Sequence, residues 1–230
     1  MSAPRIALIH AVTVAMGPVQ AAFARDWPQA TLINLLDDSL SPDRERAGDL
    51  TAAITARIEA LADYALAAQA AAILYTCSAF GAAIERVQAR LSVPVLKPNE
   101  AMFDAALASG ERIGMLATFA PSVASMESEF RAAAGERGSK ASIRSVVVPE
   151  AMRHLKAGDG SMHDRLLAET APQLQDCDAV MLAHFSTARA RDAVSARLRC
   201  PVLTSPDSAV SKLRRAMGLG ADHAPSTRST

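Results

Sequence analysis

Two residues that can exchange protons near neutral pH each lie at the end of an apolar, strand-like run. Cys77 comes directly after AAILYT (71–76), and His184 ends AVMLAH (179–184). A thiol and an imidazole both titrate within a few pH units of neutrality, so each can act as a general acid or base beside a bound substrate. The structural alternatives are a small buried apolar side chain for the cysteine and a hydrogen-bonded core residue for the histidine.

An internal repeat relates the two positions. The segments ERVQARLSVPVL (85–96) and DAVSARLRCPVL (192–203) share Val, Ala, Arg, Leu, Pro, Val and Leu in register, at an offset of 107 residues. The same offset carries the dipeptide RI at 5–6 onto RI at 112–113, and it carries the thiol onto the imidazole. One constant offset over several separated segments predicts two equivalent halves.

Short apolar runs alternate with longer segments of helical spacing. Near-continuous apolar strands joined by helices are typical of a parallel sheet covered on both faces. We therefore expect an α/β protein with two pseudo-symmetric lobes of about four strands each. The first lobe is predicted over 1–98, with a helix at 207–217 packing back on it, the second over 99–206, and a flexible tail over 218–230. SPDRE (41–45) predicts a helix capped by its first serine. The predicted strands cover 5–11, 30–36, 71–76, 93–96, 112–118, 143–148, 179–184 and 200–203.

The two lobes are expected to enclose a cleft. Ligands of open parallel sheets bind beyond the carboxyl ends of the strands, which places Cys77 and His184 on opposite sides of it. After Cys77, the helix dipole and free backbone N–H groups are expected to lower the pKa of the thiol and to bind a substrate carboxylate. The other residues predicted to contact the substrate are His10, Thr76, Ser78, Ala79, Thr118, Phe119, Phe185 and Ser186.

Other polar and thiol residues near these runs have simpler explanations. Asn99 and Glu100 are expected to cap the helix that follows them, although they could also reach the cleft. Asp207 is the repeat counterpart of Glu100 and has the same interpretation. Cys177 and Cys200 have no partner pattern and are expected to be structural, because the three cysteines suggest neither a disulfide framework nor a metal site.

The composition argues against several classes of partner. The 24 basic and 24 acidic residues give no net charge, whereas binding to nucleic acid or to an anionic membrane usually shows as a basic excess. No apolar run approaches the roughly 20 residues of a membrane span, and MSAPRIALIHA shows no cleavable signal. We expect a cytoplasmic protein with neither nucleic acid nor membrane as a partner.

Several segments together resemble a known family. In chain order they resemble the aspartate/glutamate racemase superfamily, which includes glutamate, aspartate and hydantoin racemases, maleate isomerase and arylmalonate decarboxylase. The segments are YTCSAFG (75–81), PVLKPNEAMF (94–103), IGMLATFAPS (113–122), LAHFSTA (182–188) and PVLTSPDSAV (201–210).

The resemblance implies two flavodoxin-like lobes, no cofactor and no metal, and a small carboxylate substrate bound between the lobes. It is also compatible with a homodimer. Racemases of this family place one cysteine in each lobe, on opposite faces of the substrate's α-carbon. Cys77 matches the first cysteine, whereas His184 stands where a two-cysteine racemase has the second.

The chemistry of the pair leaves several functions open. With Cys77 as a thiolate base and His184 as the conjugate acid, the favoured function is a cofactor-independent racemase or isomerase acting next to the carboxylate of an amino acid or related acid. The alternatives are a decarboxylase of the arylmalonate type, a cis–trans isomerase of the maleate type, and a carboxylate-binding protein without turnover. Phe119 and Phe185 favour a partly apolar pocket.

Overall fold

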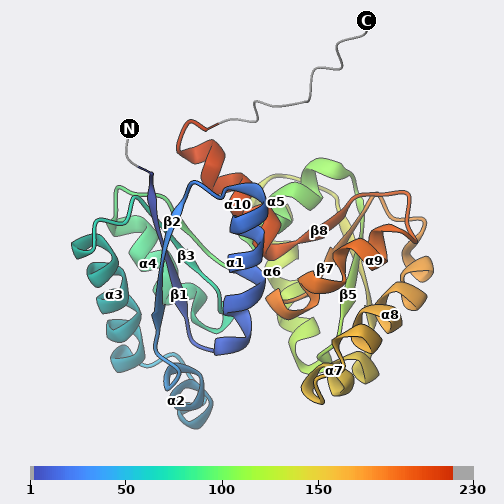
Figure 1. The fold of residues 1–230 in the computed structure, drawn as a ribbon, viewed down its shortest axis with the longest axis horizontal. Coiled ribbons are helices and arrows are strands. Elements are labelled where there is room, and N and C mark those ends of the chain that lie inside the picture. Colours follow the sequence, from blue (N-terminus) through green and yellow to red (C-terminus); the bar gives the residue numbers. More distant parts are fainter. Residues whose placement is uncertain (1–2, 220–230) are drawn as a thin grey trace, which may run out of the picture.

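The protein is an α/β protein built on two four-stranded parallel sheets, described by a computed structural model over residues 3–219. The strand orders are β2-β1-β3-β4 and β6-β5-β7-β8, so the two sheets share one topology (Figure 1). This confirms the predicted fold class, and the strand ends differ from the predicted ones by one or two residues. The strands are β1 Arg5–His10, β2 Thr31–Leu36, β3 Ala72–Tyr75, β4 Val95–Leu96, β5 Arg112–Ala117, β6 Ser142–Val147, β7 Ala179–Leu182 and β8 Val202–Thr204.

Helices connect the strands, and a short 3-10 turn follows each of β1, β3, β5 and β7. No helix between residues 3 and 219 combines the length and the apolar character that crossing a bilayer requires. The α-helices are α1 Met16–Asp26, α2 Leu40–Ala47, α3 Ala52–Ala67, α4 Gly81–Arg90, α5 Glu100–Ser109, α6 Val123–Glu136, α7 Pro149–Lys156, α8 Gly160–Thr170, α9 Arg191–Ser195 and α10 Ser205–Ala216. The turns named below are η1 Thr13–Ala15, η2 Ser78–Phe80, η3 Ala120–Ser122 and η5 Phe185–Ala190.

Each sheet is covered by helices on both faces. In the first lobe, α3 and α4 pack on one face and α1 and α10 on the other. In the second lobe, α8 and α9 pack on one face and α5 and α6 on the other. Strands β3 and β7 are buried along their whole length, which explains why they are apolar without alternation.

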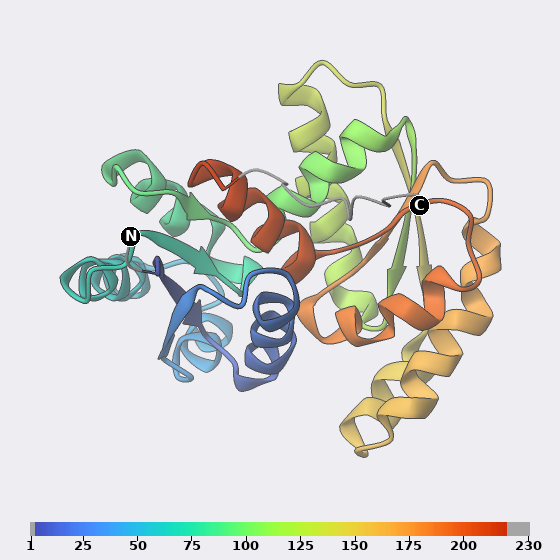
Figure 2. The same ribbon diagram turned by 45° about the horizontal axis from the view of Figure 1, so that its top comes forward.

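Each unit of the sequence repeat ends in a helix that packs on the sheet of the other lobe. These helices are α5 for the first unit and α10 for the second. Helix α5 contributes Met102 and Ala106 to the core of the second lobe. Its repeat counterpart α10 contributes Val210 and Leu213 to the core of the first lobe, and it also contacts α5. Figure 2 shows α10, in red, between the two lobes. The lobe limits at residues 98 and 206 stay predictions, and most of the predicted flexible tail, residues 220–230, lies outside the described residues.

The repeat offset holds for the central strands and fails at one edge strand. β1 and β5, and likewise β3 and β7, are related by the offset found in the sequence. β6 begins four residues further on than β2 predicts, because the connection through α6 is longer than the one through α1. The connection from β6 to β7 is correspondingly shorter, so Cys77 and His184 keep equivalent places after β3 and β7.

Candidate functional site

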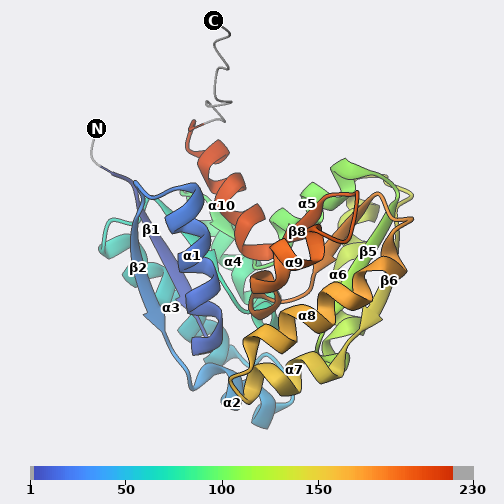
Figure 3. The same ribbon diagram turned by 45° about the vertical axis from the view of Figure 1, so that its right-hand side comes forward.

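A cavity of about 600 Å³ lies between the lobes, and both Cys77 and His184 form part of its wall. Its walls come from the segments that follow β1, β3, β4, β5 and β7, together with α7. The cavity therefore lies at the carboxyl ends of the strands, where open parallel sheets bind ligands. Figure 3 shows α2 of the first lobe and α7 of the second at the same end of the molecule. The lining residues are Val12, Val14, Ala15, Thr76, Cys77, Ser78, Pro98, Asn99, Phe119, Met152, Leu155, Lys156, His184, Phe185 and Ser186.

Cys77 lies between β3 and η2 with ordinary extended backbone angles, φ −127° and ψ 123°. Burial raises the pKa of its thiol, while hydrogen bonds from the backbone N–H of Ala79 and the hydroxyl of Ser41 lower it by less. The expectation of a lowered pKa is therefore wrong. The helix N-terminus does direct an N–H group at the sulfur, but loss of solvent around a partly buried thiolate costs more than that contact returns.

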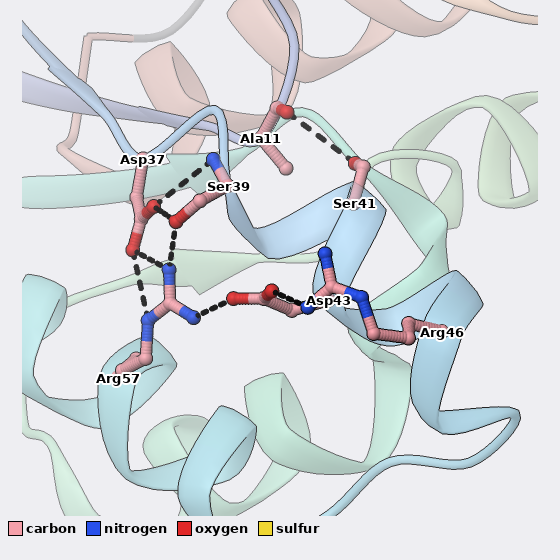
Figure 4. A network of polar contacts seen from close by, with 7 residues as sticks. All are labelled: Ala11, Asp37, Ser39, Ser41, Asp43, Arg46 and Arg57. Atoms are coloured by element: carbon pink, nitrogen blue, oxygen red, sulfur yellow. Dashed lines mark hydrogen bonds and ion pairs between the residues drawn. The ribbon is translucent and has the colours of Figure 1, made fainter.

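A polar network fixes the start of α2 (Figure 4). Asp37 accepts hydrogen bonds from the N–H of Ser39 at 3.2 Å and from its hydroxyl at 2.7 Å. Arg57 of α3 donates to Asp37 at 3.0 Å and to Asp43 of α2 at 2.6 Å. The helix consequently begins at Leu40. The prediction that it begins after a serine cap at 41 is wrong, because the turn made by Asp37 and Ser39 starts it earlier.

Ser41 lies instead in the first turn of α2, and its side chain faces the site. Its hydroxyl donates to the backbone oxygen of Ala11 at 3.3 Å (Figure 4), and the same hydroxyl lowers the pKa of the Cys77 thiol. The ion pairs of Arg57 thus hold the helix that carries Ser41.

His184 has a strained backbone. Its φ of 72° and ψ of 154° fall in a region that residues other than glycine rarely adopt. Thr187 holds this turn, because its hydroxyl hydrogen-bonds to the backbone oxygen of Ala183 and lies 2.8 Å from that of His184. Strain of this kind is found most often at functional sites.

The imidazole of His184 has one hydrogen-bonded nitrogen. Nε2 lies 2.7 Å from the hydroxyl of Ser122, and that hydroxyl donates to the backbone oxygen of Phe119 at 2.8 Å. A hydroxyl has one proton, so both contacts are satisfied when Nε2–H donates to Ser122. We assign this tautomer, which leaves the lone pair of Nδ1 for a ligand. Burial lowers the pKa of His184, so the imidazole is neutral at neutral pH rather than the conjugate acid expected from the sequence.

The remaining predicted contacts divide into two groups. Five of them line the cavity: Thr76, Ser78, Phe119, Phe185 and Ser186.

The other three do not line it. His10 is fully buried, and its ring nitrogens contact Thr76 at 2.9 Å and Asn34 at 3.1 Å, which links β1 to its two neighbouring strands. Burial lowers the pKa of His10 although the Asn34 contact raises it. Thr118 is 2 % exposed and its hydroxyl has no hydrogen-bond partner among the described residues. Ala79 contributes only its N–H. The positions of His10 and Thr118 do not support a role in ligand binding, because core packing encloses both side chains.

Asn99 reaches the cavity, contrary to the expectation of a capping side chain. It is the N-cap residue of α5, but its side chain makes no capping hydrogen bond. Its amide oxygen accepts from Ser205 at 3.0 Å, and its NH₂ group lies 3.4 Å from Glu129. The carboxylate of Glu100 accepts a hydrogen bond from the backbone N–H of Lys97 at 3.1 Å. Asp207 lies in the first turn of α10, and its carboxylate pairs with Arg25 of α1.

The sequence pattern does not indicate that α7 forms part of the site. Met152, Leu155 and Lys156 of this helix line the cavity. The order of elements could have indicated this role, because α7 follows the second strand of its lobe and α2 follows the second strand of the first lobe. Within residues 3–219, no group of three or more His, Cys, Asp or Glu side chains is placed to hold a metal ion.

Comparisons with known proteins agree with this architecture. A family model described as Asp/Glu/Hydantoin racemase matches residues 12–175, and no curated protein sequence matches the chain. A glutamate racemase isoform from Bacillus anthracis is 16 % identical with a TM-score of 0.65, over 97 % of this chain and 86 % of that one. A glycine-to-cysteine mutant of arylmalonate decarboxylase is 20 % identical with a TM-score of 0.65, over 96 % and 97 %. The allantoin racemase of Pseudomonas fluorescens is 16 % identical with a TM-score of 0.63, over 98 % and 99 %. At these identities the structural likeness shows a shared fold.

Proposed function

The chain belongs to the family of Asp/Glu/hydantoin racemases, and on that premise we propose that it is a cofactor-independent racemase or isomerase. It acts at the carbon next to the carboxylate of a small amino acid or related acid. Cys77 and His184 are its proton-transferring residues. The observation that carries the proposal is that these two residues, from different lobes and equivalent positions in the repeat, line one cavity.

The protonation states favoured by burial supply one acid and one base. Burial raises the pKa of Cys77 and lowers the pKa of His184, so at neutral pH the thiol carries its proton and the imidazole has a free lone pair. The roles are therefore the reverse of those expected from the sequence: His184 takes a proton and Cys77 gives one.

The reaction follows from this arrangement. Nδ1 of His184 takes the α-proton of the substrate, and the electron pair of the broken C–H bond moves onto the carboxylate as an enediolate. The S–H group of Cys77 donates its proton to the other face of the carbon, which forms a new C–H bond with inverted configuration. The site is left with a thiolate and an imidazolium. The imidazolium loses a proton to water and the thiolate gains one from water, which restores the starting form.

The test is exchange of the α-hydrogen for deuterium in D₂O, followed by NMR for single enantiomers of aspartate, glutamate and 2-phenylpropanoate. We expect wild type to invert at least one of these compounds and to incorporate deuterium. Cys77→Ala should lose inversion by a factor on the order of 10² or more. It should still exchange the enantiomer whose α-hydrogen faces His184. His184→Asn keeps only a protonated thiol at neutral pH, so it should exchange neither enantiomer there and should exchange the opposite enantiomer only at high pH, where Cys77 ionises.

Matched controls are Cys200→Ala and His154→Asn, which remove the same groups outside the cavity and should leave exchange unchanged. The proposal fails if wild type binds a carboxylate in the cavity without exchanging its α-hydrogen. It also fails if both cavity variants exchange and invert as wild type does.

A carboxy-lyase of the arylmalonate type is a second candidate. The observation that favours it is the raised pKa of Cys77, because a thiol that keeps its proton can deliver it to an enolate formed by loss of CO₂, and this step needs no base. Release of CO₂ from 2-phenylmalonate that is lost in Cys77→Ala and kept in His184→Asn would select the lyase.

A further inference from the structure

The cavity that holds Cys77 and His184 has a largely apolar lining. Phe119 and Phe185 follow β5 and β7, and Met152 and Leu155 come from α7. Phe119 is 47 % exposed, so its ring is accessible to a ligand of the cavity. The cavity volume of about 600 Å³ lies within the range of pockets that enclose ring-containing ligands.

Among residues 3–219, Lys156 is the one Lys, Arg, Asp or Glu side chain that lines this cavity. Lys156 ends α7, and among the described residues it has neither an ion-pair nor a hydrogen-bond partner. Other charged residues of the same helix are paired, since Arg153 contacts Glu150 at 3.5 Å and His154 contacts Asp159 at 3.4 Å. An unpaired ammonium group at the edge of an apolar cavity can bind one carboxylate.

No acidic residue in the described part of the chain lines the cavity. A free amino acid brings an α-ammonium group as well as its carboxylate, and burying that charge without a partner is costly. Glu129 contacts Asn99 from an adjoining cleft, but it does not line the cavity, and burial raises its pKa. Among residues 3–219, the cavity lining therefore offers a cation to a carboxylate but no carboxylate to an ammonium group.

A neighbouring cleft adds no unpaired cation. It adjoins the cavity at Leu155 and Ser186 and holds Arg25, Arg189 and Arg191. Each of these arginines already pairs with an aspartate, at distances of 2.6 Å, 2.9 Å and 3.4 Å respectively. Lys156 is thus the cation that remains available to a ligand of the cavity.

We infer that the substrate is a monocarboxylate that lacks a free α-ammonium group and carries a bulky apolar substituent on the carbon next to the carboxylate. Lys156 pairs with that carboxylate, and the wall formed by Phe119, Met152, Leu155 and Phe185 covers the substituent. The inference rests on the proposed function and narrows its substrate to acids other than free aspartate or glutamate.

The experiment measures binding separately from turnover. Calorimetry gives the dissociation constant, and protection of Cys77 from iodoacetamide, followed by mass spectrometry, places the ligand in the cavity. The probes are 2-phenylpropanoate, phenylglycine, 2-phenylpropanamide and glutamate. Phenylglycine replaces the methyl group of 2-phenylpropanoate with an ammonium group of similar size, and the amide removes only the charge of the carboxylate.

We expect 2-phenylpropanoate to protect Cys77 and to bind roughly tenfold or more tightly than phenylglycine or glutamate. Lys156→Met should weaken 2-phenylpropanoate roughly fivefold, the size expected for an ion pair partly open to solvent. The same change should leave 2-phenylpropanamide unaffected. Lys140→Met is the matched control, because Lys140 precedes β6 at the amino ends of the strands and should change neither affinity.

Three results would overturn the inference: phenylglycine or glutamate binding as tightly as 2-phenylpropanoate, no effect of Lys156→Met, or no binding by any probe. Deuterium exchange on the same samples separates this from the proposed function. Binding of 2-phenylpropanoate without exchange supports the ligand class and refutes the racemase. Exchange of glutamate at a rate equal to or above that of 2-phenylpropanoate supports the racemase and refutes the ligand class.

Discussion

The strained backbone of His184 predicts an unusual order of stability for two substitutions. At φ 72° and ψ 154°, a residue with a Cβ atom costs about 1–3 kcal/mol, which glycine does not incur. Glycine loses about 0.5–1 kcal/mol relative to alanine because its unfolded chain is more flexible. His184→Ala and His184→Gly both lose the hydrogen bond to Ser122, so that contribution cancels between them. We expect the glycine variant to be more stable than the alanine variant by about 1 kcal/mol.

The repeat supplies an internal control for this comparison. Cys77 occupies the equivalent position with a φ of −127°, where alanine is unstrained, so Cys77→Gly should be less stable than Cys77→Ala by about 0.5–1 kcal/mol. Urea unfolding measures both pairs, as a shift in midpoint at constant m-value. If glycine is the less stable substitution at both positions, the backbone of His184 is not strained. If the order reverses as expected, the fold holds His184 in a strained conformation, which is consistent with orientation of the imidazole for function.

Three further changes test how the site and the lobes are held. Ser41→Ala removes a hydroxyl that lowers the pKa of the Cys77 thiol. The pH midpoint of iodoacetamide labelling should therefore move further above that of an ordinary thiol, ~8.5, and an unchanged or lower midpoint would contradict this. Arg57→Ala should lower the free energy of unfolding in urea by about 1 kcal/mol, because the ion pairs that it removes are partly exposed. Arg57→Lys should recover part of this loss. An alanine variant as stable as wild type would show that the network does not stabilise α2. Leu213→Ala empties a fully buried position of α10 and should cost about 2–5 kcal/mol. A loss below about 1 kcal/mol would mean that the core around it collapses readily.

The strands and their order along the chain could be predicted from the sequence because their apolar character follows directly from burial. β3 and β7 have helices on both faces, so neither can alternate polar and apolar residues. The 107-residue repeat predicts that Cys77 and His184 occupy equivalent places, because this equivalence depends only on their positions along the chain. The strands and the repeat could both be predicted because each follows from the order of residues along the chain.

The properties of the site residues depend on three-dimensional surroundings and were harder to predict. The thiol of Cys77 follows a strand and precedes a helix as expected, but its pKa is raised because several chain segments exclude water from it. His10 occupies the end of β1, where the sequence predicts substrate contact, yet Asn34 and Thr76 from the neighbouring strands enclose it. Lys156 could be placed only once the path of α7 across the cavity was known.

A buried thiol and a buried imidazole differ from two buried thiols in their protonation states. Burial favours the neutral form of every ionisable group, so two buried thiols would both be acids, and one would have to ionise before it could take a proton. A buried thiol and a buried imidazole are an acid and a base while both are neutral.

The activity of this pair should depend on pH in a characteristic way. Protonation of His184 removes the base at low pH, and ionisation of Cys77 removes the acid at high pH. Burial lowers the pKa of His184 and raises the pKa of Cys77. We therefore expect kcat/KM to be flat across neutral pH, with an acid limb below the ordinary range of histidine and a basic limb above that of cysteine. His184→Cys should narrow the active range to high pH, where one thiol can ionise. A wild-type optimum confined to high pH would show that Cys77 must be a thiolate, and the assignment of His184 as the base would be wrong.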